Sequence, residues 1–228
     1  MPWGSQRVSF DLTPIIANWR YLAMGLGVTI TLSILTMIAA TVLGTAVALA
    51  RLYGPRWLAV VLGFYVDSAR SIPVLVVLVW TFFAFPLVVG FTLPPFWAAF
   101  LALSIYVAAY ISEIVRAGMM SIRPGQTRAA MALGMSRMQT IFRILLPQAA
   151  IRMLPPYGNM LSITIKNSAI SSVIAVPDFM RATAVVADQS YQPLELYTTA
   201  IVVFALIILP VTRVTDMIYS RLAHLGRS

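Results

Sequence analysis

"GQTRAAMALGMSRMQTIFRILLPQAA", residues 125–150, is the stretch of this chain that decides its fold. It is rich in alanine, and its helix propensity is high. It also carries three basic residues, Arg128, Arg137 and Arg143. Long apolar runs lie on both sides, so this segment is the polar exception in its neighbourhood. Gly134 interrupts it and Pro147 marks the start of a new element, so we expect a helical loop between two apolar segments.

The composition of the whole chain places that loop beside a membrane. Sixty per cent of the residues are hydrophobic, 10% are charged, and the mean hydropathy is +0.88. A soluble domain is about a quarter charged, so the composition indicates an integral membrane protein. The absence of cysteine excludes disulfides and cysteine-ligated metals, and the single histidine, His224, has no partners for a metal site.

The net charge of +9 raises the possibility of a nucleic-acid partner. The sixteen basic residues are spread between apolar segments and form no compact basic domain. We therefore expect no nucleic-acid partner, and we attribute the charges to membrane topology.

Five segments are long and apolar enough to cross a bilayer, which takes about 20 residues. They are residues 21–50, 57–87, 95–114, 157–176 and 196–222. Turn-forming sequences lie between them: "YGP" near residue 54, "PLVVGFTLPP" at 86–95 and "MLPPYG" at 153–158. We therefore predict an all-α polytopic membrane protein with one transmembrane domain, residues 1–228, five helices and a cytoplasmic loop over about 121–150. Pro73 is expected to break or bend the second helix.

The orientation follows from arginine asymmetry, because basic residues concentrate in cytoplasmic loops. An odd number of spans puts the termini on opposite sides. With the C-terminus inside, the inner segments hold eleven arginines: Arg51, Arg56, Arg116, Arg123, Arg128, Arg137, Arg143, Arg152, Arg213, Arg221 and Arg227. The outer segments hold three: Arg7, Arg20 and Arg181. We predict an external N-terminus and a cytoplasmic C-terminus, and no signal peptide is apparent in the first 20 residues.

Two interpretations of the polar loop are open from its residues alone. It could lie flat in the membrane interface, or it could dock a cytoplasmic partner. Ala129, Ala130 and Gly134 are small, and we expect Ala130 and Gly134 to share a helix face at a spacing of four. Small residues let a helix sit deep in the groove of another protein.

The loop resembles the cytoplasmic signature of bacterial ABC importer permeases, E-A-A-x3-G-x9-I-x-L-P. The matching residues are Ala129, Ala130, Gly134, Ile144 and Pro147, with Arg128 in place of the glutamate. Three further stretches resemble the polar amino acid branch of that family: "ARSIPVLVVL" at 69–78, "YISEIVRAGMMSIRPGQ" at 110–126 and "IKNSAISSVIAVPDFMRAT" at 165–183.

The resemblance implies a type I importer of a polar amino acid or related solute in the bacterial inner membrane. Its partners would be two ATP-binding subunits, a second permease copy or a similar permease, and an extracytoplasmic solute-binding protein. The signature residues, Arg128 included, would then form the contact with the ATPase. No Gly-rich phosphate loop is present, so we expect no enzyme and no cofactor in this chain, with ATP on the partner.

Two rival functions come from other classes. An ion-coupled secondary transporter would use intramembrane carboxylates, for which only Asp67 and Glu113 are candidates, each with a basic neighbour. A membrane enzyme would need a nucleophile and a base, and we find no convincing set.

Ionisable residues within spans are costly and mark candidate functional sites. Asp67 and Arg70 lie three residues apart, so they could form a structural ion pair. Alternatively, Arg70 could face a solute pathway and bind a carboxylate, with Asp67 tuning it. Glu113 and Arg116 have the same spacing, and we expect them to form an interfacial pair that anchors the third helix.

Lys166 is the only lysine and lies in the most polar span. Asn159, Ser162 and Lys166 are spaced to share one helix face, and Asn167 and Ser168 adjoin it. This face could line a wet cavity or bond to another helix. The predicted pathway set is Arg70, Asp67, Lys166, Asn167, Ser162 and Ser168. In the family that this chain resembles, the residue after this lysine is often acidic, so the resemblance implies that the neutral Asn167 mildly disfavours cationic substrates.

Overall fold

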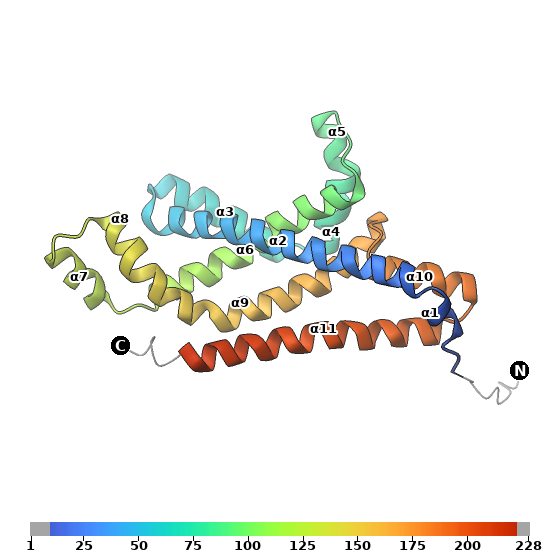
Figure 1. Ribbon diagram of the computed structural model, residues 1–228. Helices are drawn as coiled ribbons and strands as arrows, with labels where there is room; N and C mark the ends of the chain where they lie inside the picture. The colour runs from blue at the N-terminus through green and yellow to red at the C-terminus, as the bar shows by residue number, and fades with distance from the viewer. Residues whose placement is uncertain (1–9, 223–228) are drawn as a thin grey trace, which may run out of the picture.

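The computed structural model describes residues 10–222, and their regular structure is helical, as predicted (Figure 1). Arg7, His224 and Arg227 lie outside the described residues. The elements in order are α1 (Thr13–Ala17), α2 (Trp19–Tyr53), α3 (Arg56–Ser71), α4 (Val74–Val79), η1 (Trp80–Ala84), α5 (Phe85–Val89), α6 (Pro95–Met120), α7 (Pro124–Ala132), α8 (Arg137–Thr140), η2 (Ile141–Leu145), α9 (Leu146–Ser168), η3 (Ala169–Ile174), α10 (Phe179–Ser190) and α11 (Pro193–Leu222).

Among these elements, three helices, α2, α6 and α11, are individually long and apolar enough to cross a membrane. Two bent pairs bring the number to as many as five if each pair counts as one span, which agrees with the predicted five. The first pair is bent by 107° between residues 56–71 and 74–89. Pro73 lies at that bend with extended backbone, as predicted, because its ring cannot continue the helix of α3.

The short breaks between spans also lie where turn-forming residues predict them. Gly54 follows α2, and Pro55 immediately precedes α3. Gly90 follows α5 with φ +80°, a left-handed conformation that favours glycine. Pro94 and Pro95 then start α6 with their φ already near the helical value.

The fourth span departs from the prediction of one helix over residues 157–176. Helix α9 begins at Leu146 and runs through Pro155 and Pro156, so "MLPPYG" is no break. Membrane helices tolerate internal proline because neighbouring groups can satisfy the freed carbonyls. The span instead breaks after η3 and continues as α10 at an angle of 51°. Neither that break nor α10 was predicted.

At the end of the bundle opposite α7 and α8, α10 packs against α2. The Asp178 carboxylate caps α10, since its Oδ1 accepts a hydrogen bond from the Arg181 amide at 2.8 Å. The Phe179 amide donates to Thr29 Oγ1 of α2 at 3.1 Å. A Cβ on Gly25 would lie 2.8 Å from the Asp178 carbonyl oxygen. The break that precedes α10 is therefore fixed against α2.

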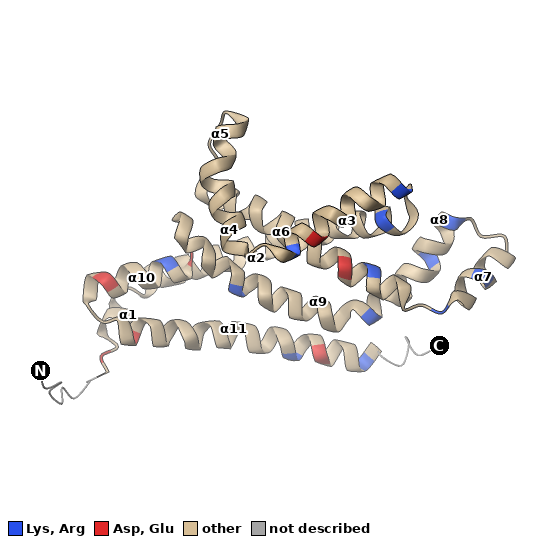
Figure 2. Cartoon of the chain, turned by 180° about the vertical axis from the view of Figure 1, so that it is seen from behind, with Lys and Arg blue, Asp and Glu red and all other residues tan. Residues whose placement is uncertain are grey.

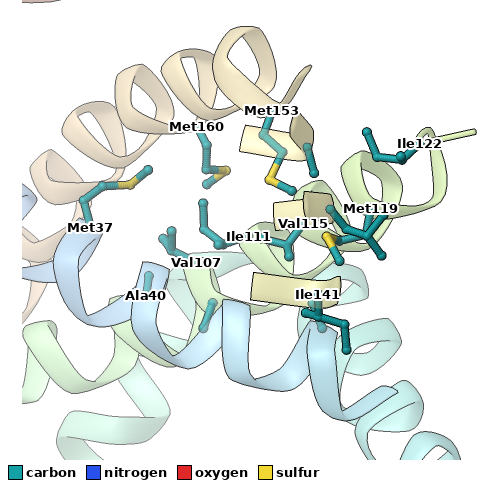
Figure 3. Packing of buried hydrophobic residues seen from close by; sticks show 14 of the residues in the cluster. Met37, Ala40, Val107, Ile111, Val115, Met119, Ile122, Ile141, Met153 and Met160 are labelled. Atoms are coloured by element: carbon teal, nitrogen blue, oxygen red, sulfur yellow. The ribbon is translucent and has the colours of Figure 1, made fainter. Parts of the chain in front are cut away.

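The half of the bundle nearer α7 and α8, which we call the inner half after the predicted topology, has its core where α2, α6 and α9 meet. Met37 and Ala40 of α2, Ile111 and Val115 of α6, and Met160 of α9 are buried together there (Figure 3). Small residues bring the helices close: a Cβ on Gly44 would lie 2.7 Å from the Ala108 carbonyl oxygen. Close approach at small residues is the usual way in which membrane helices pack.

The two ends of the bundle differ in charge. Helices α7 and α8 lie at the end where α11 finishes, and α1 and α10 lie at the opposite end (Figure 1). Most of the basic residues gather at the α7–α8 end (Figure 2). This distribution agrees with the arginine asymmetry from which a cytoplasmic loop was predicted.

Candidate functional site

The loop between α6 and α9 contains two short helices with defined ends. Helix α7 starts at Pro124 and ends at Ala132. Gly134 follows with φ +77°. Ser136 and Gln139 form a capping box at α8. The backbone N–H of Gln139 donates to Ser136 Oγ at 3.2 Å, and the backbone N–H of Ser136 donates to Gln139 Oε1 at 2.9 Å. The capping box and the glycine turn fix the path of the loop.

The signature residues do not form one helix face. Arg128 and Ala129 are exposed on α7, and Pro147 is exposed in the first turn of α9. Ile144 is half-buried in η2. Ala130 is 4% exposed, so it packs against its own chain. The prediction that Ala130 and Gly134 share a face is wrong, because α7 ends before Gly134.

The loop exposes several large apolar side chains. Leu133 is 83% exposed, and three others are exposed nearby: Met131, Met138 and Phe142. We call these four, together with Arg128 and Ala129, the loop surface. Exposed apolar groups of this kind mark sites of contact with another protein or with the membrane. Sequence patterning missed the four because, among apolar spans, nothing sets them apart.

The base of the loop is tied to α2 through charge. Glu113 of α6 accepts from Arg116 Nη2 at 2.7 Å, which confirms the predicted pair. It also accepts from Arg51 Nη1 of α2 at 2.5 Å, a partner that sequence spacing alone could not identify. The Arg137 guanidinium lies 5.2 Å from the centre of the Tyr53 ring, which links α8 to the end of α2.

Asp67 and Arg70 are both exposed near the end of α3. The ion pairs within residues 10–222 do not include them, so the structure does not support the predicted structural pair. Arg70 lies over the Tyr110 ring instead, 5.6 Å from its centre. Tyr110 also donates to the Arg70 carbonyl oxygen at 3.4 Å. The guanidinium is thus held by an aromatic face and retains its donors.

The polar face predicted for the fourth span is divided in the structure. Asn159 and Lys166 are exposed, whereas Ser162 and Ser168 are buried. The Ser162 hydroxyl donates to the Gly158 carbonyl and that of Ser168 donates to Ile165, both within their own helix. Asn167 is half-buried. Of the predicted pathway residues on this span, only Lys166 is exposed.

Lys166 lines an open cavity of about 540 Å³ between α9, α10 and α11. The other lining residues are uncharged and include Met180, Tyr197 and Phe204. Within the described residues, no group of three or more His, Cys, Asp or Glu could hold a metal ion. The cavity thus combines one charged side chain with apolar surface.

Residues 40–224 match the family described as the inner membrane component of binding-protein-dependent transport systems. The chain belongs to this family. It is 35% identical over 223 residues to the L-cystine transport system permease protein TcyB of Bacillus subtilis, covering 97% of this chain and 92% of the relative. It is also 35% identical over 218 residues to the glutamine transport system permease protein GlnP of Escherichia coli K12, covering 94% and 97%.

Solved structures agree with this assignment. One, described as an amino acid ABC transporter with histidines, has a TM-score of 0.86 at 28% identity and covers 94% of this chain and 100% of its own. An inward-facing MetNI methionine ABC transporter has a TM-score of 0.79 at 20% identity, and this likeness concerns the fold alone. The chain is thus a multi-pass inner membrane permease of an ABC importer, with ATP hydrolysis on a separate subunit. The importer assignment is favoured over an ion-coupled transporter.

Proposed function

We propose that this permease imports a polar amino acid and that α7 carries the motion of an ATP-binding subunit into the membrane helices. The observation that carries the proposal is the position of α7. It lies at the basic end of the bundle, joined to α6 by residues 121–123 and to α9 through α8 and η2, with the loop surface exposed. A partner subunit that binds the loop surface can displace α7, and α6 and α9 are the spans to which this displacement passes.

Coupling requires a difference in affinity between two conformations. ATP binding on the partner subunit has to favour one of them, since a ligand that binds both equally shifts nothing. A shift from 1:99 to 99:1 requires about 5.5 kcal/mol of differential binding. In the proposed cycle, ATP supplies this difference through α7, and the spans alternate between inward- and outward-facing states.

The substrate class is inferred from relatives and from the exposed cations. Relatives carry names that specify L-cystine, glutamine and arginine. An amino acid brings a carboxylate into the pathway, and Arg70 and Lys166 are both exposed within spans. Asn167 beside Lys166 is neutral, so a cationic side chain lacks a counter-charge there. We therefore favour a substrate with an uncharged side chain.

The assembly is proposed to contain two copies of this chain, or this chain with a similar permease, above two ATP-binding subunits. A solute-binding protein would deliver the amino acid at the α1–α10 end. The N-terminus would lie outside and the C-terminus in the cytoplasm. The clustering of arginines at the α7–α8 end supports this orientation.

The decisive experiment is uptake by proteoliposomes that contain the permease, its ATP-binding subunit and its binding protein. Radiolabelled L-glutamine, L-cystine and L-arginine are supplied separately, with ATP inside or outside the vesicles. We expect uptake of an uncharged amino acid only when ATP is present on the α7 side. Uptake that persists without ATP and is abolished by a proton ionophore would contradict the proposal and favour ion coupling.

A further inference from the structure

The two ends of the loop that contains α7 are fastened to each other at the point where they enter the membrane bundle. Arg152 of α9 donates through Nη1 to the backbone carbonyl oxygen of Ser121, the residue that ends α6. Ser121 is followed by only two residues before α7 begins at Pro124. The hydrogen bond therefore joins the entry of the loop to its exit, 31 residues later.

An apolar contact lies beside this hydrogen bond. A Cβ on Gly118 would lie 2.6 Å from Met153 Cγ, so α6 and α9 are in close contact one turn before the loop. Met153 and Ile122 are both buried in the inner core. Figure 3 shows Met119, Ile122 and Met153 in this part of the cluster. We call Gly118, Ser121, Arg152 and Met153 the clasp.

Arginine suits this position for an electrostatic reason. The last carbonyl groups of a helix have no partners within the helix and carry partial negative charge. A cation that donates to one of them is stabilised by both effects. Arg152 is partly exposed and lines an open cavity of about 580 Å³, which Glu113 and Tyr219 line as well. A hydrogen bond from a charged donor in this setting is stronger than a bond between neutral groups.

The clasp determines how far a displacement of α7 is transmitted to α6 and α9. Without it, displacement of α7 could be absorbed by separation of the α6 end from α9. With it, the two helices are held at the loop base and move as one unit. We propose that Arg152 is a positioning residue of the transport cycle, which makes movement of α7 reach the outer half of the bundle. The inference rests on the proposed contact between α7 and the ATP-binding subunit.

The experiment uses two single-cysteine reporters, which is practical because the chain has no cysteine of its own. One is Gly125→Cys on α7, where a side chain meets open space. The other is Asp188→Cys, exposed on α10 at the outer end. Each is labelled with bimane in the full complex with a cysteine-free ATP-binding subunit. Emission is compared without nucleotide and after trapping with ATP and vanadate.

In the otherwise native chain, both reporters are expected to respond to ATP and vanadate. Arg152→Met keeps an apolar stem but removes the donor, and we expect the α10 response to be lost while the α7 response remains. Arg152→Lys retains one charged donor and should restore about half of the α10 response. Arg213→Met, an exposed arginine on α11, is the matched control and should leave both responses unchanged.

Each other outcome decides against the inference. If the emission changes at both α7 and α10 are the same in Arg152→Met as in the native chain, the clasp does not transmit the movement of α7 to α10. Loss of the α7 response, alone or with that of α10, would make Arg152 a docking or folding residue instead. If Arg152→Met fails to assemble, Arg152→Lys carries the test, and a full α10 response in that variant overturns the inference. The absence of an α7 response in the native chain would instead count against the proposed function.

Discussion

Arg51 near the end of α2 donates to Glu113 of α6 in the half of the bundle nearer α7 and α8, with 2.5 Å between Nη1 and Oε1. The same carboxylate also accepts from Arg116 of α6. One carboxylate therefore lies between two guanidinium groups, and the side chains of both Arg51 and Glu113 are largely buried, 16% and 19% exposed. Removing the carboxylate would leave two cations facing each other.

Glu113→Gln should therefore destabilise the inner end of the bundle. Loss of a hydrogen-bonded charge at a largely buried site costs about 2 kcal/mol. The midpoint of thermal unfolding of the purified permease complex, measured by size-exclusion fluorescence, should fall. Arg56→Gln, an exposed arginine at the start of α3, is the control and should leave the midpoint in place. An equal midpoint for Glu113→Gln would mean that the ion pairs contribute nothing to stability.

Gly158 should be intolerant of a methyl group, because α9 and α11 touch there. A Cβ at this position would lie 2.6 Å from Thr215 Cβ, a distance that forces the helices apart. Overpacking of this kind costs about 1–3 kcal/mol, and Gly158→Ala should lower the unfolding midpoint accordingly. Gly27→Ala on α2 is the matched control, since a Cβ there meets nothing within 4 Å. Equal midpoints for the two variants would refute the close contact.

Gly134 should be needed for its backbone conformation rather than for its size. Its φ is +77°, but a Cβ would meet open space. A β-branched residue there costs about 1–2 kcal/mol or more in the left-handed region, so Gly134→Val should distort the turn after α7. Asparagine tolerates this region, so Gly134→Asn should be milder.

The readout for the three Gly134 variants, valine, asparagine and tryptophan, is ATP hydrolysis by the complex and the uptake that accompanies it. Gly134→Val and Gly134→Trp should lower uptake per ATP hydrolysed, whereas Gly134→Asn should stay close to the native ratio. If valine and asparagine behave alike, strain in the turn is not what makes this glycine necessary.

The spans were predictable from sequence because their signal is local. Runs of apolar residues identified α2, α6 and α11, and Gly54, Pro73 and Gly90 identified the points where the chain turns. The break before α10 also has a local signal, since Pro177 lies in it and Asp178 is the N-cap of α10, but the prediction of one helix over residues 157–176 did not use it. The place of this break against α2 had no such signal. It depends on Thr29, 150 residues earlier, which accepts from the Phe179 amide. Contacts of this kind are set by the packed bundle and not by neighbouring residues.

The candidate site was predictable to a similar extent. Spacing alone identified the Glu113–Arg116 pair, but not Arg51, since that contact joins two helices. Helical periodicity also placed Ala130 on the docking face, whereas tertiary packing buries it. The spacing of Asp67 and Arg70 permitted an ion pair between them. In the structure, Arg70 contacts the ring of Tyr110 instead. The role of each predicted pathway residue stays a prediction.

The orientation of the chain can be tested with reporter fusions. A green fluorescent protein fused after residue 228 or inserted within residues 121–128 should fluoresce in the cytoplasm. Alkaline phosphatase inserted within residues 88–92 should be active, because this segment is expected outside. The reason is the excess of arginine at the α7–α8 end. Phosphatase activity from a fusion within residues 121–128 would refute the five-span topology.

Arg70 and Lys166 should affect transport without affecting assembly. A substrate carboxylate in a low-dielectric pathway needs a cationic partner, since an unpaired buried charge costs several kcal/mol. Arg70 is the better candidate because its guanidinium can bind a carboxylate through two parallel hydrogen bonds. We expect Arg70→Ala to lower uptake about tenfold or more and Lys166→Ala to lower it less.

The measurement is the concentration dependence of L-glutamine or L-cystine uptake, whichever the native complex transports. Affinity of the amino acid for the separate binding protein should be unchanged, since that protein has its own site. Each variant must still co-purify with its ATP-binding subunit. Arg70→Lys keeps the positive charge but loses the two parallel donors of the guanidinium. If Arg70 pairs with the substrate carboxylate, uptake by Arg70→Lys should lie between that of the native chain and that of Arg70→Ala. If both alanine variants assemble and transport at the native rate, neither cation contacts the solute, and both serve helix packing instead.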